Sequence, residues 1–217
     1  CDAVVKDEQM IGDPTEGALV VLAEKGGIDV VQTRSAFPRV ATLPFDSEYK
    51  MMATFHRMTD EQGRDVVRCF VKGAPDQLLA RASDALGHEG LVGVDEGAKE
   101  KYLAENQRLG EQGLRVLATG SKDFDPSTFD PNADLLPLLD GMTLLALVGI
   151  VDPPRPEAKA AIATAHAAGI QVRMITGDHA VTAKAIGDQL GIVGRAVTGA
   201  EFAAMADDEL EREIDGI

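Results

Sequence analysis

An apolar run ends at a lysine and a glycine in the segment 70–75 (F-V-K-G-A-P). Lys72 supplies a cation, and Gly73 lets a ligand or a second backbone approach closely. This pair at a strand end suits a phosphate-bearing or aromatic ligand. The alternative is an ordinary turn, which is the commoner role of a Lys-Gly pair.

A second predicted strand lies upstream at 50–56 (K-M-M-A-T-F-H), and a polar, glycine-containing loop separates the two segments. A hairpin centred near Glu61 would place Lys50 opposite Lys72. Two facing lysines repel each other, and a bound anion would relieve that repulsion. The alternative is a solvated face with flexible ammonium groups. The strand period of two predicts one buried face, made of Met51, Ala53, Phe55, Val67, Cys69 and Val71.

A third segment whose residues could bind a ligand or take part in catalysis is Thr176-Gly177-Asp178. It follows an apolar run and precedes a predicted helix. Ligands of open parallel sheets bind beyond the carboxyl ends of the strands. Gly177 would let backbone N–H groups approach a phosphate, and Thr176 would donate its hydroxyl. Asp178 would orient an attacking group or a magnesium-bound water. An aspartate just before a helix is also a common N-cap, so these three residues alone identify no activity.

The composition narrows the class of protein. The 217 residues allow one large domain or two small ones, with an ordinary globular share of 45% hydrophobic and 26% charged residues. The net charge of −15 argues against nucleic acid and anionic lipid as partners. Cys1 and Cys69 form neither a metal-ligand spacing nor a disulfide framework, which predicts a reducing compartment. With no signal peptide and no apolar run near the ~20 residues that span a bilayer, we expect a soluble piece of a longer protein.

Residues 1–141 are predicted to form an α+β domain. Asp13 as N-cap, Pro14 at the first helical position and Glu16 three residues after the cap predict a helix that ends at the glycine pair 26–27. Residues 43–47 lead into the hairpin. Further predicted elements are a helix over 75–83, some strand character at 91–94, a helix over 96–112, a strand over 114–121 and a long loop over 123–140.

The pattern changes near Met142. The run 144–151 is continuously apolar, as in parallel strands buried on both faces. A stiff, proline-rich connection at 152–156 follows. A helix over 157–168, a strand over 170–175 and a helix over 179–190 then predict a right-handed crossover and a doubly wound parallel sheet. A strand-like piece at 197–199 and an acidic helix over 200–214 complete this part.

Six segments, in order, resemble the P-type cation-transporting ATPases, particularly their calcium-pump-like branch: G-D-P-T-E-G-A-L, P-F-D-S-E-Y-K-M-M, F-V-K-G-A-P, G-L-R-V-L-A, D-P-P-R and M-I-T-G-D-H. The resemblance implies an ATP-binding domain over 1–141, with an antiparallel sheet flanked by helices. It also implies a partial phosphorylation domain over 142–217, of the α/β, Rossmann-type haloacid-dehalogenase class, with a hinge near 150–156. Both would lie on the cytoplasmic face of a membrane ion pump.

The same resemblance assigns the base-binding residues. Phe45 would stack on the adenine of ATP, and Lys72 would line the adenine pocket. Gly73 would allow close approach, Lys50 would lie beside the nucleotide, and Glu16 would face the adenine end. Two alternatives stay open here. Glu16 could instead complete a capping box with Asp13, and Phe45, which follows a proline, could be an ordinary core residue.

Residues at the phosphate end come from the same resemblance. Arg115 would reach the phosphates of ATP·Mg²⁺, although it could also be a surface strand residue. Thr176 and Gly177 would meet the terminal phosphate, with Asp178 beside it. Asp152 and Arg155 would belong to the hinge. Ser47 and Tyr49 stand where relatives often carry a basic residue, which weakens the expected hold on the phosphates.

Two further motifs of that family, the phosphorylated D-K-T-G-T and the magnesium-binding G-D-G-x-N-D, do not occur in the 217 residues. We therefore expect ATP binding without turnover, in partnership with the transmembrane and actuator parts of the pump. Without its central strand, the second part should expose a sheet edge and apolar surface. The alternatives are a stand-alone phosphatase of the same superfamily, which would need a D-x-D-x-T strand, and an interaction module without a ligand.

Overall fold

The computed structural model describes residues 1–6, 9–151, 154–177 and 180–217. The chain divides into two compact units. The first unit contains Cys1–Lys99 and Leu117–Ile150, and the second contains Glu100–Val116 and Val151–Ile217. Each unit is described by itself.

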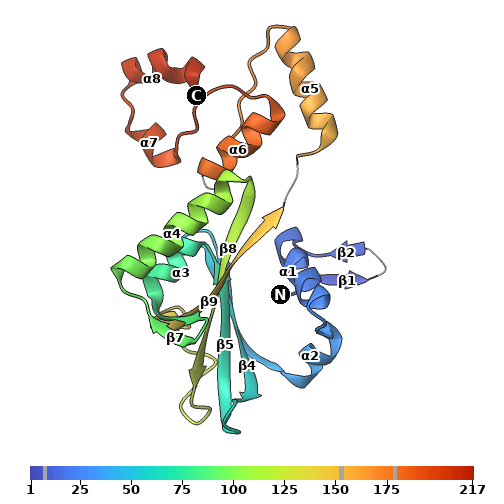
Figure 1. Ribbon diagram of the computed structural model, residues 1–217, viewed down its shortest axis with the longest axis vertical. Helices are drawn as coiled ribbons and strands as arrows, with labels where there is room; N and C mark the ends of the chain where they lie inside the picture. The colour runs from blue at the N-terminus through green and yellow to red at the C-terminus, as the bar shows by residue number, and fades with distance from the viewer. Residues whose placement is uncertain (7–8, 152–153, 178–179) are drawn as a thin grey trace. The chain divides into compact units, whose positions relative to one another are not determined.

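A seven-stranded sheet dominates the fold, in the order β3-β4-β5-β8-β9-β6-β7 (Figure 1). Strands β3, β4, β5 and β8 pair antiparallel, whereas β6 pairs parallel with β9. The sheet is thus mixed, where the resemblance implied an antiparallel one. The strands are β3 Arg39–Asp46, β4 Met51–Thr59, β5 Asp65–Gly73, β6 Ala82–Gly87, β7 Gly90–Gly93, β8 Leu114–Phe124 and β9 Met142–Val151.

The β4–β5 hairpin has the predicted faces in a register that differs by two residues. Met52 lies opposite Lys72, and Thr54 lies opposite Phe70. The loop causes the difference, because the Asp60 carboxylate accepts hydrogen bonds from the backbone N–H groups of residues 62 and 64 and centres the turn on residue 62. A shift of two leaves side-chain alternation unchanged. The predicted buried face is therefore confirmed: Met51, Ala53, Phe55, Val67, Cys69 and Val71 are all buried.

The main core covers this face of the sheet. Phe55 packs against the rings of Phe124 and Phe129, with ring centroids 6.0 and 5.2 Å away, and those two rings also contact each other at 5.8 Å. Helix α3 (Pro75–Arg81) begins at the proline that the sequence indicated and buries Leu78 and Leu79. The loop after β8 contains a short 3₁₀ helix, η1 (Pro137–Leu139).

Helices α1 (Pro14–Lys25) and α2 (Val30–Ala36) lie beside the sheet, with a small hairpin of β1 (Val4–Lys6) and β2 (Gln9–Ile11) (Figure 1). The predicted N-cap of α1 is confirmed, because the Asp13 carboxylate accepts the Glu16 N–H at 3.1 Å. Helix α2 was not predicted. Asp29 caps it by accepting the Gln32 N–H at 2.8 Å.

Strand β9 corrects the prediction for residues 144–151. It lies between β8 and β6 in the seven-stranded sheet, so residues 142–150 belong to the first unit, although the sequence pattern assigned them to the second domain. Only its first part is fully buried, at Met142 and Leu144, and Val151 is exposed. An apolar run alone therefore did not distinguish a parallel strand buried on both faces from a partly exposed strand of a mixed sheet.

The second unit is helical in its described part. It contains most of α4 (Glu96–Glu111), together with α5 (Pro156–Ala167), α6 (Ala180–Leu190), α7 (Gly199–Ala204), α8 (Asp207–Glu213) and the 3₁₀ helix η2 (Ile214–Gly216). Thr182 of α6 donates its hydroxyl to the Leu114 carbonyl at 3.2 Å. Arg173 donates to the Ile214 carbonyl at 2.8 Å and so joins the segment after α5 to η2. The predicted helix over 200–214 is two helices, and 197–199 is not a strand.

The predicted strand over 170–175 is not formed. This segment pairs with no strand in the described parts of the second unit, so a doubly wound parallel sheet is not present there. A strand requires a hydrogen-bonded neighbour, and the neighbouring helices cannot supply one. Two of its apolar side chains are consequently left in solvent, as expected for an uncovered face: Ile170 is 58% and Ile175 99% exposed.

No helix in the described ranges has both the length and the apolar composition needed to cross a membrane.

Candidate functional site

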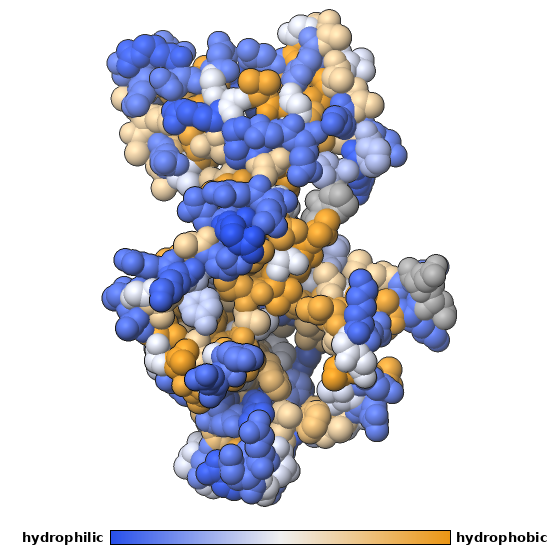
Figure 2. Space-filling model, viewed as in Figure 1, coloured by the Kyte–Doolittle hydropathy of each residue, from blue (hydrophilic) through white to orange (hydrophobic). Residues whose placement is uncertain are grey.

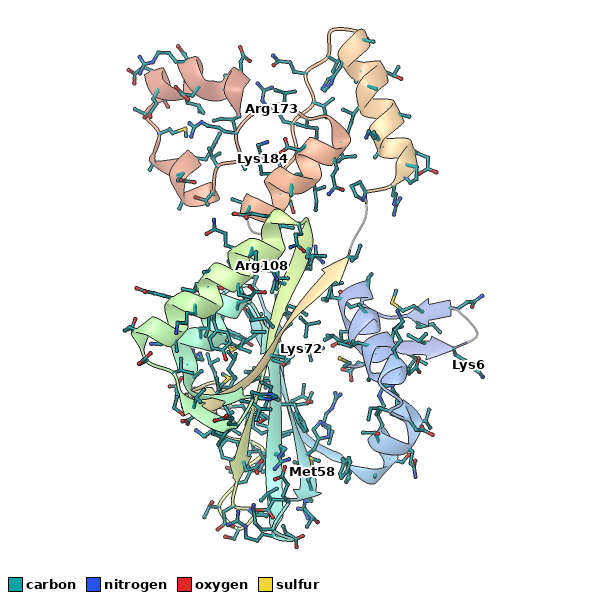
Figure 3. All side chains as sticks on the ribbon, viewed as in Figure 1. Lys6, Met58, Lys72, Arg108, Arg173 and Lys184 are labelled. Carbon is teal, nitrogen blue, oxygen red and sulfur yellow. The ribbon has the colours of Figure 1, made fainter. Side chains whose placement is uncertain are left out.

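Lys72 and Glu16 form an ion pair that joins β5 to α1. The Lys72 Nζ and Glu16 Oε1 atoms lie 2.5 Å apart, and both side chains are mostly buried, at 16% and 12% exposure. Figure 3 shows Lys72 on the side of the sheet that faces α1. The two residues are separated by 56 positions in the chain. The fold therefore brings together two of the side chains to which the resemblance assigned base binding.

The Glu16 carboxylate also holds the start of the chain. It accepts the Asp2 N–H at 2.6 Å and the Ala3 N–H at 3.1 Å. Although the Glu16 N–H contacts Asp13 as a capping box requires, the described contacts of the Glu16 carboxylate lead to Lys72 and to residues 2 and 3. The capping-box interpretation of Glu16 is therefore wrong.

Two opposing effects act on the pKa of Glu16. Burial raises this pKa, but the hydrogen bond from Lys72, the Asp2 N–H and the nearby positive charge together outweigh burial, so the pKa lies below its ordinary value of 4.5. Because the unfolded chain then binds the proton more tightly, the stabilisation from this group is complete above pH 4.5 and is lost as pH falls through the lower folded-state pKa.

The acid limb of the stability curve should report this group. We expect the Glu16→Gln variant to lose less stability than the wild-type chain as the pH is lowered below about 4.5, since an amide has no proton to gain. Urea unfolding at a series of pH values measures the difference. Parallel curves for the two chains would contradict the ion pair as the cause.

Phe45 lies in a β-bulge near the end of β3. Leu43 pairs with Ala53 and Asp46 with Met51, so β3 uses three steps where β4 uses two. The extra residue falls at Pro44–Phe45, where proline is tolerated because it has no N–H to pair. A bulge redirects the side chains around it, and Phe45 is 63% exposed. The core interpretation of Phe45 is therefore wrong.

Lys50 departs from its predicted strand register, and the close approach predicted at Gly73 is made by the protein's own backbone. Lys50 lies outside β4 with a φ of +50° and is not opposite Lys72, so the proposed repulsion between the two lysines is absent. Gly73 is needed by the protein itself, because a Cβ there would lie 2.5 Å from the Lys50 carbonyl oxygen and 2.6 Å from the Met51 Cβ. The close approach at Gly73 is thus between neighbouring strands, whatever it also permits for a ligand.

Strand register relates Phe45 to Lys72. Asp46, Met51 and Gly73 form one row across β3, β4 and β5. Phe45 comes one residue before Asp46 in β3, and Lys72 comes one residue before Gly73 in β5. Two strand spacings separate their backbones, or about 10 Å. Met52, which pairs with Lys72, comes from the strand between them. The strand period of two, which predicted the buried face, also puts Met52 on the face opposite to it with Lys72, and this signal could have identified Met52 from the sequence.

A separate cavity of about 420 Å³ lies between α1, α2 and the sheet. Figure 2 shows the surface hollowed beside these helices. Its walls include Ile28, Phe37 and His56, and of the described residues that line it none is a predicted site residue. Its two arginines already have partners: Arg34 donates to the carbonyls of residues 1 and 3, and Arg39 binds Asp2 at 2.5 Å.

The residues predicted at the phosphate end belong to the second unit. Arg115, on β8, is half-buried and has interaction partners, as does Thr176. Gly177 is exposed, and a Cβ added to it would meet open space. Asp178 and the hinge residue Asp152 lie outside the described residues, whereas Arg155 precedes α5. Within the described ranges, no group of three or more histidine, cysteine, aspartate or glutamate residues could hold a metal ion.

Comparison with known proteins defines the class to which this chain belongs. The family model described as P-type ATPase, cytoplasmic domain N, matches residues 2–157. The chain therefore belongs to the P-type ATPase family, and the match includes Glu16, Phe45, Lys50, Lys72 and Arg115.

Several curated proteins are similar over nearly the whole chain. The cation-transporting ATPase pma1 of Synechocystis is 41% identical over 94% of this chain and 22% of its own length. The probable cation-transporting ATPase F of Mycobacterium tuberculosis is 39% identical over 98% of this chain and 24% of its own length. The human calcium-transporting ATPase type 2C member 1 is 36% identical over 98% of this chain and 22% of its own length. The chain thus spans about a quarter of the length of these relatives.

Proposed function

We propose that this chain is the ATP-binding part of a cation-transporting P-type ATPase and that it holds the base of ATP between Phe45 and Lys72. The observation that carries the proposal is the exposed Phe45 ring at a bulge, two strands from a lysine that is already held in place. An exposed phenyl ring offers a stacking surface, and stacking on a base contributes roughly 1–3 kcal/mol.

The Glu16–Lys72 pair suits a neutral purine. A carboxylate and an ammonium group side by side offer an acceptor and a donor, which match the exocyclic amino group and a ring nitrogen of adenine. Because the two charges cancel, the pair itself has little net attraction for phosphate. Met52 would form the floor between the two walls, and Lys50 would lie beside the nucleotide.

The phosphate end would use the second unit. Arg115 would contact the phosphates, and Thr176 and Gly177 would approach the terminal phosphate, with Asp178 beside them. Mg²⁺ would be bound by the phosphates of ATP. In the whole protein, domain closure about a hinge near residues 150–156 would deliver the γ-phosphate to an aspartate, where catalysis is mainly positioning and charge stabilisation.

The assignment of parts follows from this proposal. The first unit would be the ATP-binding domain, and the second would be a portion of the phosphorylation domain. The parent would be an ATP-hydrolysing cation pump whose transmembrane and actuator domains are the partners of this chain. These residues would work on the cytoplasmic face of the membrane.

An ATP titration tests the proposal. We expect the wild-type chain to bind ATP with a Kd of roughly 0.1–10 mM, because base contacts alone supply only a few kcal/mol net. Amide chemical shifts followed by NMR should move first around residues 45, 52 and 72. A flat titration of the folded chain would contradict the proposal and favour an interaction module without a nucleotide.

The chain should not become phosphorylated. Its 217 residues contain no D-K-T-G-T segment to receive the phosphoryl group, so incubation with Mg²⁺ and γ-³²P-labelled ATP should leave no acid-stable label on the protein. The matched control is a longer relative that contains this segment. Hydroxylamine-sensitive label on this chain would contradict the proposal that the phosphorylated aspartate lies outside these 217 residues.

A further inference from the structure

The loop after Phe45 is closed by a set of local hydrogen bonds. The Lys50 N–H donates to the Asp46 carbonyl at 2.8 Å, and the Glu48 N–H donates to the Asp46 carboxylate at 2.7 Å. The Lys50 carbonyl accepts the Ala74 N–H at 3.0 Å, which anchors the loop to the end of β5. The far side of the loop is therefore fixed to the sheet.

Tyr49 crosses this loop. Its hydroxyl donates to the Pro44 carbonyl at 2.9 Å. The carbonyl of Pro44 and the nitrogen of Phe45 belong to one planar peptide unit. A hydrogen bond to that carbonyl therefore restrains the orientation of the peptide unit that leads into Phe45. The proline ring fixes φ on the other side of the same residue, so both sides of Pro44 are restrained.

Packing alone does not account for the orientation of Phe45, because this residue is mostly exposed to solvent. A ring that is exposed at a bulge would otherwise be free to sample several rotamers. A ligand that binds to a mobile ring must order it, which weakens binding about 2- to 12-fold for each side chain immobilised. The hydrogen bond from Tyr49 acts on the ring through the backbone, because it restrains the peptide unit before Phe45 and the allowed rotamers of a side chain depend on its backbone angles.

We propose that Tyr49 is a positioning residue that holds the Phe45 ring ready to stack on a base. This inference rests on the proposed ATP site and adds a residue to it. The Tyr49 hydroxyl is protonated at physiological pH, as in an ordinary tyrosine, and can donate; burial and the nearby Asp46 carboxylate raise its pKa further.

The Tyr49→Phe variant tests the proposal because it removes only the hydroxyl. We expect ATP binding to weaken about 3- to 10-fold, because the Phe45 ring must then be ordered when the nucleotide binds, while the thermal unfolding midpoint changes little. The chain has two tyrosines, and Tyr102→Phe on α4 is the matched control, which should bind as the wild type does. Equal affinity of the wild-type and Tyr49→Phe chains for ATP would overturn the proposal.

A double-mutant cycle separates positioning from general structural support. In a Phe45→Ala background, Tyr49→Phe should cause no further loss of affinity, because the ring that it positions is gone. Additive losses would show that Tyr49 acts on binding by another route and would overturn the proposal.

A measurement without nucleotide keeps the outcome independent of ATP binding. Three-bond couplings that report the χ1 angle of Phe45 should indicate one dominant rotamer in the wild-type chain and averaging in Tyr49→Phe. Averaging in both chains, or a single rotamer in both, would overturn the role of Tyr49. A flat ATP titration of the wild-type chain would instead count against the proposed function, and the couplings would still decide the role of Tyr49.

Discussion

The Phe45→Ala variant is expected to bind ATP at least about tenfold more weakly than the wild-type chain, because it removes a stacking contact of roughly 1–3 kcal/mol. With a wild-type Kd of roughly 0.1–10 mM, the Kd of the variant should rise to about 1 mM or more, which is weak but still measurable by NMR titration at high ATP concentration. Stability should change little, since Phe45 is 63% exposed and fills no core space. Isothermal titration calorimetry and NMR titration measure the loss, and thermal unfolding checks the fold.

Phe37→Ala is the informative control for this result. Phe37 lines the separate cavity beside α2, so its removal should leave ATP affinity unchanged if the base binds at Phe45. The opposite pattern, with Phe37→Ala weakened and Phe45→Ala normal, would move the base into the cavity and contradict the assignment of Phe45.

The Glu16→Ala variant is expected to lower the free energy of unfolding by about 3 kcal/mol. Breaking a buried ion pair leaves an uncompensated charge, which costs about 3–5 kcal/mol when burial is complete. The value at the low end follows from the remaining exposure of the two side chains. The backbone N–H groups of Asp2 and Ala3 would lose their acceptor as well.

Urea unfolding at neutral pH measures this loss. The matched control is Glu24→Ala on the same helix, where the glutamate is exposed; an exposed charge typically contributes less than about 1 kcal/mol. If both variants lost the same small amount of unfolding free energy, Glu16 would be an ordinary surface residue. The fixed Glu16–Lys72 pair that the proposed base site requires would then be absent.

Local signals were the best predictors of structure. Asp13, followed by Pro14 and Glu16, predicted where α1 begins, because a cap depends only on neighbours in the chain. Alternation over 51–55 and 67–71 predicted the buried face of the hairpin for the same reason. The register could not be predicted to the residue, because it depends on how the Asp60 side chain organises its loop.

Elements that depend on distant partners were missed or misassigned. Strand β6, A-S-D-A-L-G, has little strand propensity of its own and forms between β9 and β7. The segment 170–175 has the opposite character: its composition favours a strand, but it lacks a hydrogen-bonded neighbour in the described residues. Pairing, rather than composition, decided both cases.

The candidate site likewise combines features that the local sequence indicates with features that depend on distant residues. Residue types at 16, 45 and 72 were recognisable through the resemblance to the family, but the contact between Glu16 and Lys72 joins residues 56 positions apart. The exposure of Phe45 follows from a bulge of one residue, which no local pattern around Pro44 specified. The hydrogen bond from Tyr49 to Pro44 depends on the same bulge and on the loop after it, so the local sequence did not specify it either.

Intermolecular NOEs between ATP and the ¹³C-labelled chain test the central claim most directly. The proposed site predicts NOEs from the adenine protons H2 and H8 to the Phe45 ring and to the Met52 methyl group. NOEs from those protons to Ile28 and Phe37 in the cavity instead, with none to Phe45, would contradict it.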